Sequence, residues 1–252
     1  MHQMFPMMID RPSKRAMVSG ITYWMFAFLF IPCILTLGVI FSYAPTYELE
    51  MEIAYHIVNF VVSLLIFWRY MKANFLNVQI EVKKVCSTIG LCAVVIVILR
   101  AGLLQIFTLA GNTELAGILF HYLPTVEMDL FLTPAMLLQQ QPVFGAICIV
   151  ILAPVSISCL LYGCVFAQVC VDHQPWQAYL ATTAMFLLQH VAMILAYHSA
   201  QEHLTLFALA LPVHLIACWS YQKTDTIWTP IGVHMLANLA FTLVYFKGLG
   251  IF

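Results

Sequence analysis

Long apolar stretches separated by short polar connections make up most of the chain. A helix that crosses a membrane needs about 20 mostly apolar residues, because each residue advances the helix by only about 1.5 Å. Apolar stretches of this length predict seven membrane-spanning helices, at residues 18–43, 53–71, 84–110, 143–170, 176–197, 204–221 and 227–246.

The segment 111–142 departs from this pattern. It holds two shorter apolar stretches, Leu115–Leu123 and Leu130–Leu138, and it is interrupted by Pro124 and Pro134. A short or re-entrant helix here would need protein or water around its broken backbone, because lipid offers no hydrogen-bonding partner. The sequence therefore predicts seven or eight spans.

The composition agrees with a membrane location. Of the 252 residues, 63% are hydrophobic and only 8% are charged, whereas soluble domains carry about 25% charged residues. A soluble fold cannot bury this much apolar surface, because its outer layer must be polar. We therefore expect an all-α, polytopic transmembrane helix bundle. Residues 1–252 contain no linker, low-complexity run or obvious repeat, which favours a single integral membrane domain.

Charge and cysteine usage narrow the expected partners. The formal net charge is −1 and no basic stripe occurs, so nucleic acid is not an expected partner. Membrane lipid is the expected one, and a membrane protein or peptide is a further candidate. The eight cysteines lie within or beside apolar stretches and form no CxxC pair. We interpret them as small buried hydrophobes rather than as metal or redox groups.

The basic residues predict the orientation. Eight of the ten lie on the cytoplasmic side if the N-terminus is cytoplasmic: Arg11, Lys14, Arg15, Arg69, Lys72, Lys83, Lys84 and Lys223. This distribution follows the positive-inside rule, with Arg100 and Lys247 as exceptions. We expect a bacterial cytoplasmic membrane, with the N-terminus cytoplasmic and the C-terminus outside. The first apolar run, of about 25 residues, is too long for the core of a cleavable signal peptide.

Ionisable side chains within the spans are the first candidates for a site, because such groups are expensive in a membrane. His190 and His234 lie on separate spans, and Asn238 follows His234 by four residues on the same helical face. Two imidazoles that face one cavity can hold a metal or position a water. The alternative is one interhelical hydrogen bond for each histidine. The remaining candidates are His56, Arg100 and His214. Arg100 lies near the middle of its span, which favours an internal structural partner.

Three patterns in the C-terminal part of the chain occur in a fixed order. Residues 186–190 read F-L-L-Q-H, residues 221–230 read Y-Q-K-T-D-T-I-W-T-P, and residues 234–238 read H-M-L-A-N. These patterns resemble those of the CAAX prenyl protease and bacteriocin-processing (CPBP or ABI) family of intramembrane proteases. That family has the motifs FxxxH and HxxxN, with the lead-in Y-x-K-T-G-S-L-W-x-P before the second. The resemblance covers about residues 143–245.

The resemblance implies a fold and a set of site residues. It implies the protease fold, with a cavity bounded by the fourth, fifth and seventh spans. In that family a glutamate activates the attacking water, while histidines and an asparagine bind or stabilise the reacting centre. The matching residues are His190, His234 and Asn238. An active member could hold a divalent metal such as zinc on His190 and His234, and no other cofactor is implied.

The first motif of that family, a proline followed by EExxxR, is altered in this chain. Aligning residues 153–155 (A-P-V) and Gly163 with the family's A-P-I and R-G places Ile157 and Ser158 at the glutamate pair and Tyr162 at the arginine. A serine hydroxyl cannot replace a carboxylate as general base near neutral pH, and isoleucine has no proton chemistry. A metal would also lose its anionic ligand. We expect Ser158 to bond its own helix backbone rather than to act as a nucleophile.

Two functions fit these observations. The favoured one is a pseudoprotease that acts as a membrane scaffold or regulator. The alternative is an active intramembrane, CAAX-type endopeptidase with a displaced carboxylate, for which Glu127 and Asp129 are the best candidates, ahead of Asp172 and Glu202. A small transporter is a third function, but no internal repeat supports it.

Overall fold

The computed structural model describes residues 12–32, 34, 48–122, 124, 132–197 and 200–248, with side chains described for all of these except 171–172, 190–197 and 200–205. Within these ranges the chain is helical and contains no strand. The α-helices are α1 (Lys14–Trp24), α3 (Glu48–Ile80), α4 (Val82–Leu109), α5 (Thr113–Tyr122), α6 (Pro134–Gln140), α7 (Pro142–Ile147), α8 (Ala153–Ile157), α9 (Ala167–Asp172), α10 (Pro175–Tyr197), α11 (Ala200–Thr224) and α12 (Trp228–Gly248). The π-helical segments are η1 (Met25–Phe30), η2 (Cys148–Leu152) and η3 (Ser158–Phe166).

The all-α membrane fold predicted from the apolar pattern is confirmed. Within the described ranges, four helices are long and apolar enough to cross a membrane: Glu48–Ile80, Val82–Leu109, Pro142–Cys170 and Trp228–Gly248. The chain is therefore an integral membrane protein, and the total of seven or eight spans stays a prediction. The segment 111–142 contains the two short helices α5 and α6, and residues 125–131 between them lie outside the described part.

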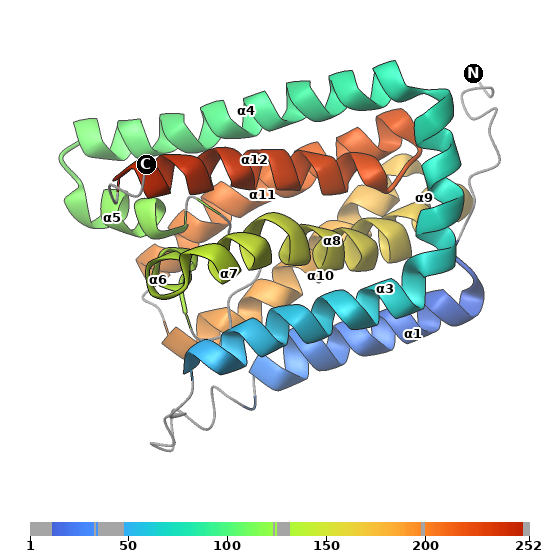
Figure 1. Cartoon of the computed structure of the whole chain (residues 1–252), viewed down its shortest axis with the longest axis horizontal. Coiled ribbons are helices and arrows are strands. Elements are labelled where there is room, and N and C mark those ends of the chain that lie inside the picture. Colours follow the sequence, from blue (N-terminus) through green and yellow to red (C-terminus); the bar gives the residue numbers. More distant parts are fainter. Residues whose placement is uncertain are drawn as a thin grey trace.

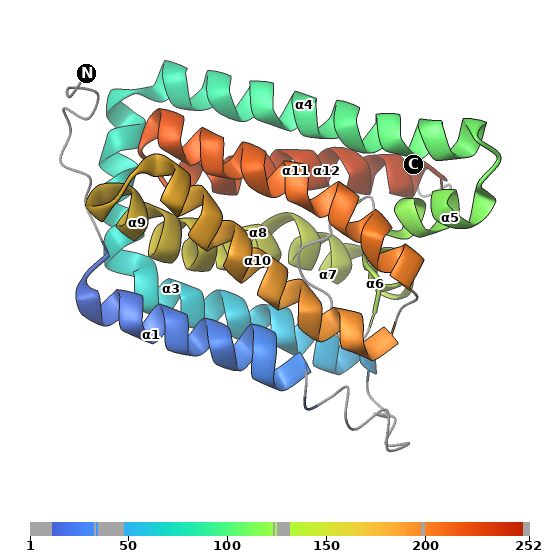
Figure 2. The same cartoon turned by 180° about the vertical axis from the view of Figure 1, so that it is seen from behind.

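One long helix runs through the centre of the bundle. It consists of α7, η2, α8, η3 and α9 in succession. α1 and α3 lie along one side of it and α12 lies on the other, with α4 at the far edge (Figure 1). The opposite view shows α10 and α11 on the other face of the bundle, with α10 crossing in front of the central helix (Figure 2). Of the most apolar window of this helix, 67% is buried in the protein, against 22% for α4. The altered first motif therefore lies in the core of the molecule.

The outer helices present apolar side chains to their surroundings. Leu65 on α3 and Leu109 on α4 are each 77% exposed, and Ile98 on α4 is 64% exposed. A soluble protein rarely exposes apolar faces of this extent, whereas lipid accommodates them without cost. These exposed faces agree with helices that contact acyl chains.

Hydrogen bonds to α3 fix the turn between α11 and α12. The Thr226 hydroxyl donates to the carbonyl of Asn74 (3.2 Å), and the backbone N–H of Ile227 donates to the Asn74 side-chain oxygen (3.2 Å). The indole N–H of Trp228 donates to the carbonyl of Met71 (2.9 Å). Thr226, Ile227 and Trp228 belong to the lead-in pattern of residues 221–230. Part of that pattern therefore serves to dock this turn on α3.

A row of buried polar side chains on α3 differs from the sequence-based expectation. The helix is described from Glu48, so Glu52, which precedes the expected span 53–71, lies on the helix and is 1% exposed. Glu52, His56, Asn59 and Ser63 are all buried and recur every three or four residues, which places them on one face. The expectation failed because the apolar run that marks the span begins one turn after the helix does.

Candidate functional site

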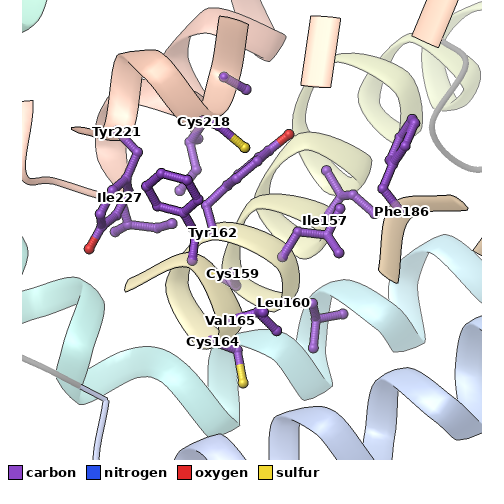
Figure 3. Packing of buried hydrophobic residues seen from close by; sticks show 14 of the residues in the cluster. Ile157, Cys159, Leu160, Tyr162, Cys164, Val165, Phe186, Cys218, Tyr221 and Ile227 are labelled. Carbon is purple, nitrogen blue, oxygen red and sulfur yellow. The ribbon is translucent and has the colours of Figure 1, made fainter. Parts of the chain in front are cut away.

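The candidate site lies in the interior, where α10, α11 and α12 pack near the central helix. His234 and Asn238 lie one turn apart on α12, and Tyr162 lies on η3. All three side chains are buried. Figure 3 shows this part of the central helix. Tyr162 and Ile157 belong to the hydrophobic cluster drawn there, which also contains Phe186 from α10.

Aromatic rings connect the motif residues. The ring of His214 stacks on Phe186 at 4.6 Å between centroids and on Tyr162 at 5.6 Å. The Tyr162 hydroxyl and His214 Nδ1 form a hydrogen bond of 3.2 Å. His234 packs edge-on against the Tyr162 ring, with centroids 5.8 Å apart. Tyr162 thus contacts His234 of the H-M-L-A-N pattern and is joined through His214 to Phe186 of the F-L-L-Q-H pattern.

Asn238 uses both ends of its amide in contacts within the protein. Its side-chain oxygen accepts a hydrogen bond from Arg100 Nη1 (3.3 Å), and its side-chain nitrogen donates to the carbonyl of Ile149 (3.1 Å). The Arg100 guanidinium also lies 5.7 Å from the centroid of the Phe241 ring. The buried Arg100 therefore has the internal partner that its mid-span position predicted, and that partner is the motif asparagine.

Pro154 explains why the carbonyl of Ile149 accepts a hydrogen bond from another helix. In the π-helical segment η2, the N–H of Ala153 bonds the carbonyl of Cys148, five residues earlier. In the same register the carbonyl of Ile149 would pair with residue 154, but proline has no N–H. Asn238 supplies the missing donor. The proline of the altered first motif and the asparagine of the HxxxN motif are therefore linked through one backbone carbonyl.

The two residues that the sequence alignment predicts at the family's glutamate pair are buried. Ile157 belongs to the main hydrophobic cluster, and Ser158 is 0% exposed. The Ser158 hydroxyl has no hydrogen-bond partner in the described part of the chain. The expected bond to its own helix backbone is thus not formed, whereas the nearby Ser156 does bond the carbonyl of Leu152 (2.8 Å). The π-helical register that begins at Ser158 changes the local backbone geometry.

Several predicted residues fall outside the described side chains. His190 lies on α10, but its side chain is not described, so its meeting with His234 stays a prediction. Glu127 and Asp129 lie outside the described residues. The side chains of Asp172 on α9 and Glu202 on α11 are likewise not described.

Glu52 and His56 form a buried acid–imidazole pair on α3. Glu52 Oε1 lies 3.3 Å from His56 Nε2, and Glu52 Oε2 accepts a hydrogen bond of 3.3 Å from the backbone N–H of Leu132. A carboxylate removed from water is costly unless it is paired in this way. Glu52 therefore connects α3 to the residues just before α6, and it is a buried acid that the sequence-based search for carboxylates missed.

The described donors alone do not form a zinc centre, and because the side chain of His190 is not described, zinc on His190 and His234 stays a prediction. Among the described side chains, no group of three His, Cys, Asp or Glu residues is placed to hold a metal ion. Zinc sites in proteins use at least three such ligands. Around His234 the described neighbours are instead the phenol of Tyr162 and, one turn away, the amide of Asn238. We assign no step of chemistry to a metal.

The fold and these contacts define a helical integral membrane protein in which a buried histidine and asparagine pack on an acid-free stretch of the central helix. A family model described as Rce1-like, type II CAAX prenyl endopeptidase Rce1-like, matches residues 139–240. The resemblance inferred from the motifs is thus confirmed over this segment, which contains all three patterns. No curated protein and no solved structure matches the chain.

Two contacts between buried polar side chains were not predicted from the sequence: the pair Glu52–His56 and the hydrogen bond between Tyr162 and His214. The pairing of Glu52 with His56 has a signal, because the two residues are four apart and carry complementary groups. The link of Tyr162 to His214 has none, since neither spacing nor residue type reveals which faces of two distant helices meet. Tyr162 also lies in the π-helical segment η3, so its direction does not follow the 3.6-residue period of an α-helix.

Proposed function

We propose that this chain is a non-proteolytic relative of the CAAX prenyl endopeptidases that serves as a membrane scaffold or regulator for a membrane protein or peptide. One observation carries the proposal. The stretch of the central helix that corresponds to the family's first motif offers Ile157, Ser158 and Tyr162 in place of two carboxylates and a guanidinium, and the ring of Tyr162 packs against His234.

The chemistry of peptide hydrolysis supports this proposal. Attack by water near neutral pH requires a general base whose pKa is close to the working pH. A serine hydroxyl, a tyrosine hydroxyl and an asparagine amide are not such bases. Asn238 is moreover held by Arg100 and by the carbonyl of Ile149. These contacts give the retained motif residue a structural role that would preserve it without catalysis.

The alternative function, an active intramembrane peptidase with a displaced carboxylate, gains one observation from the structure. Glu52 is a buried carboxylate 3.3 Å from the His56 imidazole, and a positioned carboxylate can serve as a general base. It joins Glu127 and Asp129 as a candidate acid. Both oxygens of Glu52 are already engaged, one with His56 and one with the N–H of Leu132, so we favour a structural role for it.

The proposal is tested with the purified full-length chain in lipid nanodiscs and a farnesylated peptide that ends in a CAAX sequence. Mass spectrometry detects any cleaved product, with and without added zinc. We expect no more product than from a His234→Ala variant. A variant that restores the family motif, Ile157→Glu with Ser158→Glu and Tyr162→Arg, serves as the positive comparison after its thermal stability has been checked.

Cleavage by the unaltered chain that disappears in His234→Ala would overturn the proposal. In that case Glu52→Gln and the pair Glu127→Gln with Asp129→Asn would identify the acid. Glu114→Gln is the matched control, because Glu114 is an exposed acid on α5. Loss of cleavage in Glu52→Gln but not in Glu114→Gln would assign the role of base to Glu52.

A further inference from the structure

A pocket of about 790 Å³ lies between the first turns of α1 and the middle of α3. Its lining combines two arginines, Arg15 and Arg69, with the hydroxyl-bearing residues Ser13 and Ser19. None of the candidate site residues described above lines it. The pocket is therefore a separate feature of the membrane bundle.

Neither arginine of the pocket has a partner among the residues that the structure describes. Neither Arg15 nor Arg69 makes a hydrogen bond or ion pair with another described residue, and both side chains are exposed. Guanidinium groups match phosphate oxygens in geometry and bind them through paired hydrogen bonds. Two guanidiniums that have no partner in the described part of the chain and line one pocket therefore favour an anion there.

The remaining wall of the pocket is apolar. Val61, Leu64 and Leu65 line it on α3, on the stretch that precedes Arg69. From Val61 to Arg69 the helix rises by about 12 Å over eight steps of about 1.5 Å. The pocket therefore runs from a doubly cationic end along an apolar wall, and Leu65 is among the side chains most exposed to lipid.

Other positive charges gather at the same end of the bundle. Lys84 is close enough to Asp225 in the turn between α11 and α12 to affect its ionisation, and that turn is bonded to Asn74 of α3. Trp68, which precedes Arg69, also lines the pocket and is 58% exposed, as an interfacial tryptophan would be. Basic pockets between helices at a membrane surface bind anionic lipid headgroups.

We infer that this pocket binds an anionic phospholipid whose phosphate pairs with Arg15 and Arg69 and whose acyl chain lies along the apolar wall of α3. A soluble anion would use only the cationic end, and a neutral lipid only the apolar wall. The combination of both in one pocket is what selects a charged lipid. This inference is independent of whether the chain is proteolytic.

The test is native mass spectrometry of the full-length chain, delipidated in detergent and then titrated with phosphatidylglycerol. Phosphatidylcholine with the same acyl chains and inorganic phosphate are titrated in parallel. We expect a retained phosphatidylglycerol molecule and weak phosphatidylcholine binding. The dissociation constant for phosphatidylglycerol should rise roughly fivefold for Arg15→Gln or Arg69→Gln alone and roughly 25-fold for both together.

The matched control is Lys14→Gln with Lys72→Gln. It removes the same charge from exposed positions on the same two helices, outside the pocket lining. Binding as weak in this control as in the double arginine variant would assign the effect to diffuse surface charge and overturn the inference. Equal binding of phosphatidylcholine, or equal thermal stabilisation by phosphate alone, would also overturn it. The single arginine variants keep the test valid if the double variant folds poorly.

Discussion

At the scale of single residues, Asn238 satisfies two groups that would otherwise be costly in the membrane interior. One is Nη1 of Arg100, and the other is the carbonyl of Ile149. The carbonyl needs an outside donor because Pro154 cannot supply one in the π-helical register. The asparagine of the H-M-L-A-N pattern thus makes two structural contacts in this chain.

The link between Pro154 and Asn238 predicts a measurable coupling. Asn238→Ala should lower the thermal stability in detergent, since it leaves the Ile149 carbonyl without a donor. Pro154→Ala introduces an N–H that can bond this carbonyl within the helix. The loss caused by Asn238→Ala should therefore be smaller in the Pro154→Ala background. Interhelical hydrogen bonds of this kind average about 0.6 kcal/mol, so a full double-mutant cycle is required.

Arg100 provides the control for this cycle. The Arg100–Asn238 contact does not involve the carbonyl of Ile149, so Pro154→Ala should leave the cost of an Arg100→Leu substitution unchanged. Strict additivity of Pro154→Ala and Asn238→Ala would show that the two residues do not share one carbonyl.

Asp225 predicts a stability change that depends on pH. It is half-buried and has a φ of 50°, in the left-handed region, where the family's lead-in pattern has glycine. Burial raises its pKa, Lys84 opposes this and Glu81 adds to it. A raised pKa means that the fold disfavours the charged carboxylate. The penalty is therefore absent at low pH, grows as the pH rises from the pKa of the unfolded state toward that of the folded state, and is constant above it.

Asp225→Asn should therefore stabilise the protein at pH 7, because asparagine tolerates the left-handed region and carries no charge. A gain of about 1 kcal/mol would raise the Tm by about 2–4 °C in a chain of this size. The difference from the unaltered chain should shrink as the pH is lowered toward 4, as followed by differential scanning fluorimetry. Asp225→Ala should be less stable than Asp225→Asn at every pH, and the reverse order would contradict the backbone argument.

At the scale of helices, the apolar pattern predicted which segments are helical but not how they begin or how their backbones run. The expected span 53–71 is observed as Glu48–Ile80, since the helix continues beyond the apolar core at both ends. Glu52 was consequently misplaced. The π-helical segments of the central helix could not be predicted either, because they depend on the bonding of the backbone within the packed bundle. The lead-in pattern of residues 221–230 was identified from the sequence, but its hydrogen bonds to Asn74 could be seen only in the structure.

Two glycines differ in whether a side chain would fit at their positions, one at a close contact between helices and one in open space. A Cβ on Gly145 of α7 would lie 2.9 Å from the carbonyl oxygen of Leu137, a backbone atom that cannot move aside. A Cβ on Gly90 of α4 would meet nothing within 4 Å. Gly145→Ala should therefore destabilise the protein by about 1–3 kcal/mol.

Gly90→Ala is the matched control for this substitution. It should leave stability unchanged or raise it by up to about 1 kcal/mol, because alanine favours the helix. Thermal unfolding of both variants in the same detergent measures the difference. Equal effects of the two substitutions would show that α7 does not approach α6 as closely as described.

At the scale of the whole molecule, the polar groups fall into separate regions. The Tyr162–His214–His234 cluster and the Asn238–Arg100 contact lie in the interior, while the phospholipid pocket lies between α1 and α3 at the basic end of the bundle. A scaffold needs a stable interior and a defined position in the membrane more than it needs an accessible reacting centre. This division agrees with the proposed function.

The gathering of positive charge at one end predicts the orientation in the membrane. Cys86 lies in the first turns of α4 and is the exposed cysteine among those described. It follows Lys83 and Lys84, so the positive-inside rule places it on the cytoplasmic side. A membrane-impermeant maleimide should label it in inverted membrane vesicles but not in right-side-out vesicles or intact cells.

A Cys86→Ser variant measures the background from the other cysteines. Labelling of Cys86 from the outside would reverse the orientation, and it would place the phospholipid pocket in the outer leaflet, because Arg69 precedes Cys86 on the same side of the bundle.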